Sequence, residues 1–145
     1  MAERAKSEEE LRKLSIEMRY LEQTADALQQ RISLVNSALT DISYANMTLD
    51  GIEKEKENSQ LLVPIGGSSY VKAKIADTNK VIIGLGAGVS VEKTLPEAKV
   101  MLKERQDELE KTMNSAQQQF TQVAERINSG RSRLETLLGA REGKP

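Results

Sequence analysis

The chain has 145 residues, a length that usually corresponds to one domain, but it contains no tryptophan, one phenylalanine and three tyrosines. Its 21 basic and 22 acidic residues leave a net charge of −1, which gives no electrostatic reason to expect nucleic-acid binding. Histidine and cysteine are both absent, so the usual general base, the commonest metal ligands and thiol chemistry are missing. We therefore expect neither catalysis nor a cofactor.

The termini and apolar runs give no sign of targeting or of a membrane span. Residues 1–10 are polar and charged, unlike a signal peptide. The longest apolar run, residues 81–89, is too short to cross a bilayer. We expect no membrane partner, and the absence of cysteine is compatible with a cytoplasmic protein.

The first arm, residues 1–58, carries the pattern of a long coiled-coil helix. Its apolar residues recur at alternating steps of three and four, which is typical of a coiled-coil seam. Ser7 and Glu10 have the spacing of a capping box, and we expect the helix to end near residue 57. Asn46 takes a seam position, where it either fixes the register or marks a loosening of the seam. The seam residues are Leu11, Leu14, Met18, Leu21, Ala25, Leu28, Ile32, Val35, Leu39, Ile42 and Leu49.

The middle segment, residues 59–94, is β-rich. Turn-forming clusters at 66–69 and 77–79 separate short runs of β-branched residues, which predicts four short strands in two hairpins. The run 81–83 reads as a strand buried on both faces. Gly84, Gly86 and Gly88 lack the ending of a phosphate-binding loop and the spacing of a dinucleotide fingerprint, so we assign them to a turn or to close strand packing.

The second arm, residues 95–138, repeats the heptad pattern. Thr94 is the predicted N-cap, Pro96 then lies in the first turn, and Gly139 is the predicted stop before a tail over residues 139–145. The seam residues are Leu95, Leu102, Leu109, Met113, Ala116, Phe120, Val123, Ile127, Leu134 and Leu137.

The two arms are expected to pair antiparallel, because the insert returns the chain. The favoured register sets large residues against small ones: Met18 against Gly130, Ala25 against Val123, and Ile32 against Ala116. A register displaced by one heptad places Ala25 against Gly130 and leaves a void. In the favoured register Glu17 and Arg133 flank the seam as a pair of opposite charge.

The predicted fold class is mainly α with a small β insert, a two-helix coiled coil joined by two β-hairpins. Isolated hairpins leave unpaired edges and an apolar face, which favour strand addition from other chains. The sequence therefore predicts an oligomer in which several subunits pool their strands into a shared β core, with the helical arms projecting from it.

The insert also resembles the α-class subunits of the prefoldin family, and the short, plain termini resemble an archaeal form. The first and second arms fit that architecture, but the specific similarity lies in six short motifs of the insert. These are Leu62-Val63-Pro64-Ile65-Gly66-Gly67, Tyr70-Val71-Lys72, Asp77-Thr78, Val81-Ile82-Ile83, Gly86-Ala87-Gly88-Val89 and Val91-Glu92-Lys93.

The resemblance implies a cytoplasmic hexamer of two α and four β subunits, in which the hairpins form a double β-barrel platform. It would act without ATP, hold non-native client proteins between the coiled-coil tips and pass them to a group II chaperonin. The residues implied in subunit assembly are Tyr70, Val71, Ile75, Val81, Ile82, Ile83, Val89 and Val91.

The client-binding residues are argued physically, because capture of unfolded chains requires exposed apolar groups on mobile supports. The apolar residues at the free helix ends are Leu11, Leu14, Leu134, Leu137 and Leu138. The alternative is that these leucines close the last layers of the seam, although Leu138 falls outside it.

Two other functions stay open at this point. One is a structural coiled-coil scaffold or tether that uses its sheet only to oligomerise. The other is a prefoldin-like subunit of a complex that works outside the chaperonin route.

Overall fold

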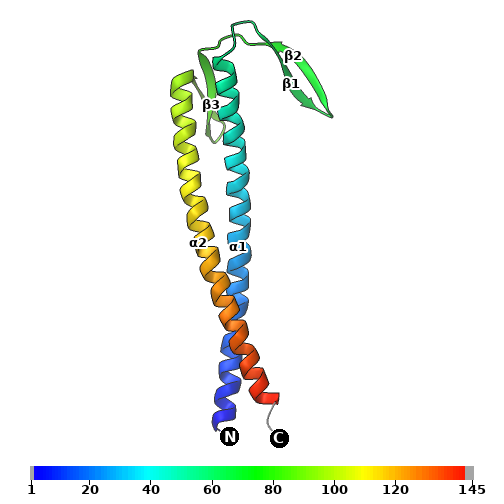
Figure 1. Cartoon of the computed structure of the whole chain (residues 1–145), viewed down its shortest axis with the longest axis vertical. Coiled ribbons are helices and arrows are strands. Elements are labelled where there is room, and N and C mark those ends of the chain that lie inside the picture. The colour runs from blue at the N-terminus through cyan, green and yellow to red at the C-terminus, as the bar shows by residue number, and fades with distance from the viewer. Residues whose placement is uncertain (1, 143–145) are drawn as a thin grey trace. The chain divides into compact units, whose positions relative to one another are not determined.

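The computed structural model describes the backbone of residues 2–142 and the side chains of residues 2–140. Two long helices and, between them in the sequence, two β-hairpins make up the chain, which confirms the predicted fold class (Figure 1). In chain order the elements are α1 (Ala2–Glu53), β1 (Gln60–Gly66), β2 (Ser69–Lys74), β3 (Lys80–Gly86), β4 (Val89–Thr94) and α2 (Leu95–Glu142).

The chain divides into two compact units, and each is described by itself. The hairpin unit spans Ala38–Glu110 and holds the four strands together with the adjoining parts of both helices. The terminal unit holds the described residues before Ala38 and after Glu110. Each unit has its own cluster of buried apolar side chains.

In the terminal unit the helices pack through the predicted seam. Met18, Leu21 and Ile127 form the buried cluster. Gly130 is buried directly against Met18, and a Cβ at position 130 would collide with the Met18 Sδ atom. This contact confirms the favoured register, because it sets a large residue against the glycine. The half-buried residues that pack against the cluster are Leu14, Ala25, Val123 and Leu134.

Two charged residues beside this seam form ion pairs with partners other than the predicted ones. Arg133 donates two hydrogen bonds to Glu10 Oε1, from Nε at 3.1 Å and from Nη2 at 2.7 Å. Glu17 lies 3.9 Å from Arg126 instead. The predicted Glu17–Arg133 pair is therefore wrong, because these long side chains reach a neighbour one helical turn or more along the partner helix.

In the hairpin unit Asn46 has a partner on α2. Its Nδ2 donates to Gln106 Oε1 at 3.2 Å, and both side chains are half-buried. A polar seam residue that bonds across the interface penalises any shift of register, since the shift would leave both amides unpaired. The bond favours the register-fixing interpretation over a loosened seam.

The helix ends differ from the predicted ones. Helix α1 begins at Ala2, so Ser7 lies inside the helix and is not its cap. The first ten residues are rich in Ala, Glu, Lys and Arg, whose helix propensity is high enough to extend the helix. At the other terminus α2 continues through Gly139 to Glu142, because one glycine costs only about 1 kcal/mol in a helix. The remaining tail residues, 143–145, lie outside the described part.

Helix α1 ends at Glu53, earlier than the predicted residue 57. Just beyond it, Asn58 N donates to Ile75 O at 2.9 Å, and Ile75 N donates to Ser59 O at 3.0 Å. These bonds close the base of the first hairpin and take residues 58 and 59 out of the helix. At the start of α2 the predicted cap is confirmed, since Glu97 N donates to Thr94 Oγ1 at 3.3 Å.

The two hairpins have the same design. Each closes through a two-residue turn with positive φ at both positions, Gly67 (56°) and Ser68 (61°) in one and Ala87 (52°) and Gly88 (77°) in the other. Positive φ at both central residues is the mark of a type I′ hairpin turn. The strands shift register just before each turn, between Pro64 and Gly66 in β1 and between Gly84 and Gly86 in β3. Gly86 and Gly88 therefore serve the second turn, whereas Gly84 lies in β3 opposite Ser90, and nothing lies close enough to any of them to indicate tight packing.

Candidate assembly and client-binding surfaces

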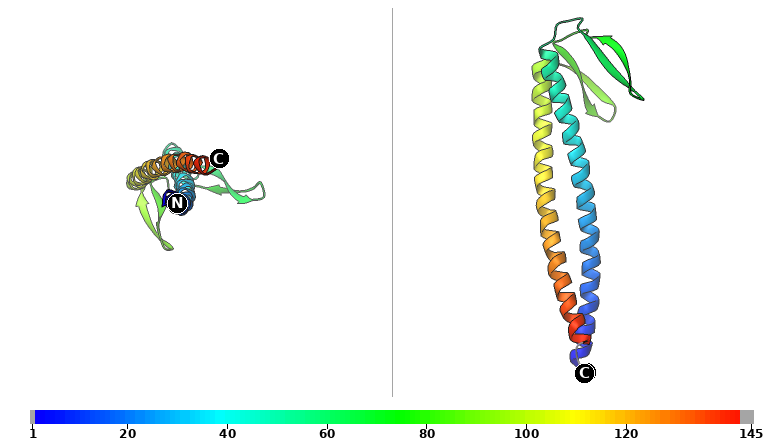
Figure 2. Two further views of the ribbon diagram at one scale, coloured as in Figure 1. Left: turned by 90° about the horizontal axis from the view of Figure 1, so that it is seen from below. Right: turned by 45° about the vertical axis from the view of Figure 1, so that its right-hand side comes forward.

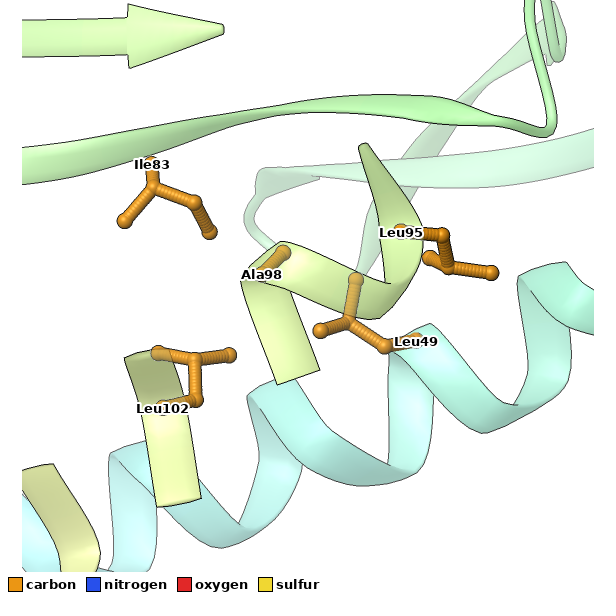
Figure 3. Close-up of a cluster of buried hydrophobic side chains, with 5 residues drawn as sticks. All are labelled: Leu49, Ile83, Leu95, Ala98 and Leu102. Carbon is orange, nitrogen blue, oxygen red and sulfur yellow. The ribbon is translucent and has the colours of Figure 1, made fainter. Parts of the chain in front are cut away.

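One face of the β3–β4 hairpin is anchored to the helices. Ile83, only 7% exposed, points toward Leu49 of α1 and the first turns of α2 (Figure 3). Val81 and Val91 share its face of the hairpin and pack against the same cluster. Arg105 of α2 adds a hydrogen bond from Nη2 to the Gly84 carbonyl at 2.6 Å. The buried members of the cluster are Leu49, Ile83, Leu95, Ala98 and Leu102.

The opposite face of that hairpin is free within the chain. Ile82 is 76% exposed although it adjoins Ile83, because successive strand residues point to opposite faces. The expectation that 81–83 is buried on both faces is therefore wrong for the single chain. Val89 after the turn is also exposed. The predicted assembly set thus divides into residues that hold the hairpin to the helices and residues that face outward.

The β1–β2 hairpin presents apolar side chains on both faces. Tyr70 pairs with Pro64 on one face, Val71 pairs with Val63 on the other, and both Tyr70 and Val71 are largely exposed. Ile75, at the base of the hairpin, is half-buried. No residue of this hairpin belongs to the buried cluster that holds β3–β4.

Four exposed apolar residues of the hairpins were not in the predicted assembly set: Leu62, Val63, Ile65 and Leu85. Ile65 and Leu85 occupy equivalent places, each at the register shift that precedes its turn. The repeated apolar-Gly pair before each turn was a sequence signal that could have identified them.

The strand edges complete this surface. Each sheet in the described chain has only two strands, β1 with β2 and β3 with β4, and the hairpins are separate ribbons (Figure 2). Every strand therefore keeps one row of backbone N–H and C=O groups without a strand partner. Exposed apolar faces beside unpaired edges are the features that favour strand addition by another subunit.

The predicted client-binding leucines do not form one exposed group. Leu14 and Leu134 pack against the cluster of the terminal unit. Leu11 and Leu137 are half-buried. Leu138 alone of the five is exposed, at 40%, in agreement with its place outside the seam.

Neither a metal centre nor a membrane segment can be built from the described residues. They contain no group of three or more potential metal-ligating side chains. No helix among them is both long enough and apolar enough to pass through a membrane. Among the described residues, the pKa of Lys99 is clearly shifted: hydrogen bonds from Lys99 to Glu53 and Asp50 raise it.

Comparison with known proteins identifies relatives over most of the chain. The family model described as "Prefoldin subunit" matches residues 21–139. A prefoldin subunit alpha of Methanococcoides burtonii is 32% identical, with 93% of this chain and 95% of that protein covered. A prefoldin subunit alpha of Nitrosopumilus maritimus is also 32% identical, with 96% and 97% covered.

Solved structures match the fold. A filamentous PFD from Methanocaldococcus jannaschii aligns with a TM-score of 0.67 at 19% identity, covering 79% of this chain and 95% of that one. The prefoldin β subunit from Thermococcus strain KS-1 aligns with a TM-score of 0.58 at 17% identity, covering 88% and 90%.

Proposed function

Because the chain belongs to the prefoldin family, we propose that it is the α-class subunit of an ATP-independent chaperone that holds non-native proteins. The observation that carries this proposal is the similarity to α subunits over nearly the full length of both proteins. The proposed complex acts in the cytoplasm and transfers its clients to a group II chaperonin.

The proposed assembly is a hexamer with two copies of this chain and four β-class subunits. Unpaired strand edges and exposed apolar side chains on both hairpins support it. Tyr70, Val71, Ile82 and Val89 are the assembly residues of the original set that face outward in the single chain. Ile83 and its neighbours Val81 and Val91 act indirectly, because they hold β3–β4 against the helices.

Clients are proposed to bind at the free helix ends. Leu138 supports this role most directly, because it is exposed and lies outside the heptad seam. Leu11 and Leu137 are half-buried, and they would join a client surface only when the last turns of the helices separate. Leu14 and Leu134 serve the seam first, since both pack against buried side chains.

The test begins with native mass measurements on this chain, alone and mixed with β-class subunits. We expect a mixed complex of two copies to four that suppresses aggregation of a denatured client without ATP. A stable dimer that ignores both β-class subunits and clients would support the scaffold function instead.

A matched pair of substitutions then tests the tips. L138S should leave the melting temperature and the hexamer unchanged but weaken suppression of client aggregation. L134S removes a packed seam residue, so it should lower the stability of the terminal unit as well. Full suppression by an intact L138S hexamer would remove Leu138 from the client surface.

A further inference from the structure

Helix α1 carries a second heptad stripe on its outer surface, within the terminal unit. Ile16, Tyr20 and Leu34 are large apolar side chains, and they are 64%, 68% and 72% exposed. Exposed glutamines and an alanine fill the steps between them. The stripe proceeds by steps of four, three, four, three and four, and consists of Ile16, Tyr20, Gln23, Ala27, Gln30 and Leu34.

This α1 outer stripe contains no charged residue, although 30% of the chain is charged. The outer face of α2 in the same unit has no comparable apolar residues. Its corresponding positions are polar or charged: Ser115, Gln118, Gln122, Glu125, Ser129 and Ser132. The stripe is therefore specific to one helix and is not a general consequence of helix composition.

Alternating steps of three and four over an exposed, uncharged face are the pattern that a partner helix recognises. The seam with α2 uses the opposite face of α1, where Met18 and Leu21 are buried. The outer stripe is thus available to a separate helix without any change in the existing pair.

The charges that flank the stripe identify the occupant. In a parallel coiled coil, the residue before one seam position faces the residue five places later on the partner helix. When two copies of α1 align in register, Asp26 of each copy faces Arg31 of the other, and Arg12 faces Glu17. Arg19 faces Thr24, so no like charges meet.

Asp26 and Arg31 are also free to make this contact. Both are exposed, and neither belongs to an ion pair within the described chain. A second copy would supply opposite charges to both residues at once.

An antiparallel arrangement of the same two stripes fits less well. It sets Ile16 against Leu34, but it also sets Tyr20 against Gln30 and Ala27 against Gln23, so four of its six layers pair an apolar group with an amide. In the parallel register each large apolar residue meets its own copy, and each glutamine meets a glutamine that can hydrogen-bond with it. The glutamines lower affinity but favour this alignment over shifted ones.

We propose that the α1 outer stripe binds the same stripe of a second copy of this chain, parallel and in register. The contact is weak and reversible, because two of its six seam positions are glutamines and its apolar area is small. It is independent of the hairpins and joins copies along their helices.

Cysteine crosslinking on the full chain tests the proposal, because the natural sequence contains no cysteine. In the parallel register Gln23 faces its own copy, so oxidised Q23C should form a disulfide-linked dimer. Q118C is the matched control, an exposed glutamine on the outer face of α2, and should form little dimer. Equal yields from the two variants would overturn the proposal.

Charge reversal then tests the register. In the Q23C background, D26R should lower the dimer yield about tenfold, since two attractive pairs become repulsive. Adding R31D should restore the yield, and circular dichroism should show unchanged helix content in every variant. Failure of the restoration would refute the register.

Two further outcomes would also overturn the proposal. In a mixture of Q23C and A27C chains, a predominance of 23–27 links would show an antiparallel contact. Crosslinking of Q23C to a denatured cysteine-containing client, without self-crosslinking, would show that the stripe binds clients instead of a second copy.

Discussion

Adjacent residues of β3 should separate the folding of this chain from its assembly. Ile83 is 7% exposed and packs on the helices, whereas Ile82 is 76% exposed on the other face of the strand. Truncation of a buried isoleucine to alanine costs about 2–5 kcal/mol through lost transfer energy and the cavity left behind. Ile83 belongs to a cluster of only five buried side chains, so we expect the lower part of this range, about 2–3 kcal/mol, for I83A.

This cost should appear as easier local opening of the β3–β4 hairpin. Since 1.4 kcal/mol corresponds to a tenfold change in an equilibrium constant, the amides of β3 and β4 should exchange with solvent about 30–150 times faster in I83A. Hydrogen exchange followed by mass spectrometry on the full chain measures this directly. The α1 and α2 amides of the terminal unit provide an internal reference.

I82A is the matched control, because it removes the same atoms from the exposed face. Its hairpin should exchange at nearly the natural rate in the isolated chain, while its complex with β-class subunits should weaken. If I82A and I83A accelerated exchange equally, the assignment of one strand face to the helices and the other to assembly would be refuted.

Three further predictions concern individual contacts. Lys99 Nζ lies 3.1 Å from Asp50 Oδ1 and also bonds Glu53. These bonds raise the pKa of Lys99 in the folded chain. The contribution of Lys99 to stability is therefore complete below the ordinary pKa of 10.5 and is lost as the pH rises through the folded pKa. Thermal melts from pH 8 to 12 should show this alkaline loss in the natural chain and a reduced loss in K99M, and identical profiles would contradict it. Ala87 has a positive φ, which glycine adopts more easily than alanine. A87G should therefore stabilise the β3–β4 hairpin by about 0.5–1 kcal/mol and slow the exchange of its amides. Faster exchange would show that the turn is not strained. Replacement of both Asn46 and Gln106 by leucine should raise the melting temperature, whereas N46L alone should give a smaller gain or a loss, because it leaves the Gln106 amide without its cross-helix donor.

The seam could be predicted because it follows from local periodicity and one steric choice. Setting the large Met18 against Gly130 selected the register that the structure has. The faces of β3 could not be predicted in the same way, since three consecutive β-branched residues contain no alternation. Only the contact of Ile83 with the helices distinguishes one face from the other.

The partners of long charged side chains were equally beyond prediction. Glu17 and Arg133 lie on the correct edges of the seam, but each side chain has several neighbours within reach and the energy differences are small. The terminal leucines illustrate a related limit. Periodicity places Leu134 and Leu137 in the seam, but it does not say how far burial extends toward the helix ends.

The base of the first hairpin has a consequence for how such chains change in evolution. Asn58 and Ser59 are hydrogen-bonded to Ile75, so the residue before the first hairpin and the residue after it lie side by side. The whole excursion of residues 60–74 is a closed loop whose removal leaves two ends already in contact. A single deletion or insertion at this point would therefore subtract or add a complete hairpin, and with it a complete set of strand edges, without altering the path of either helix.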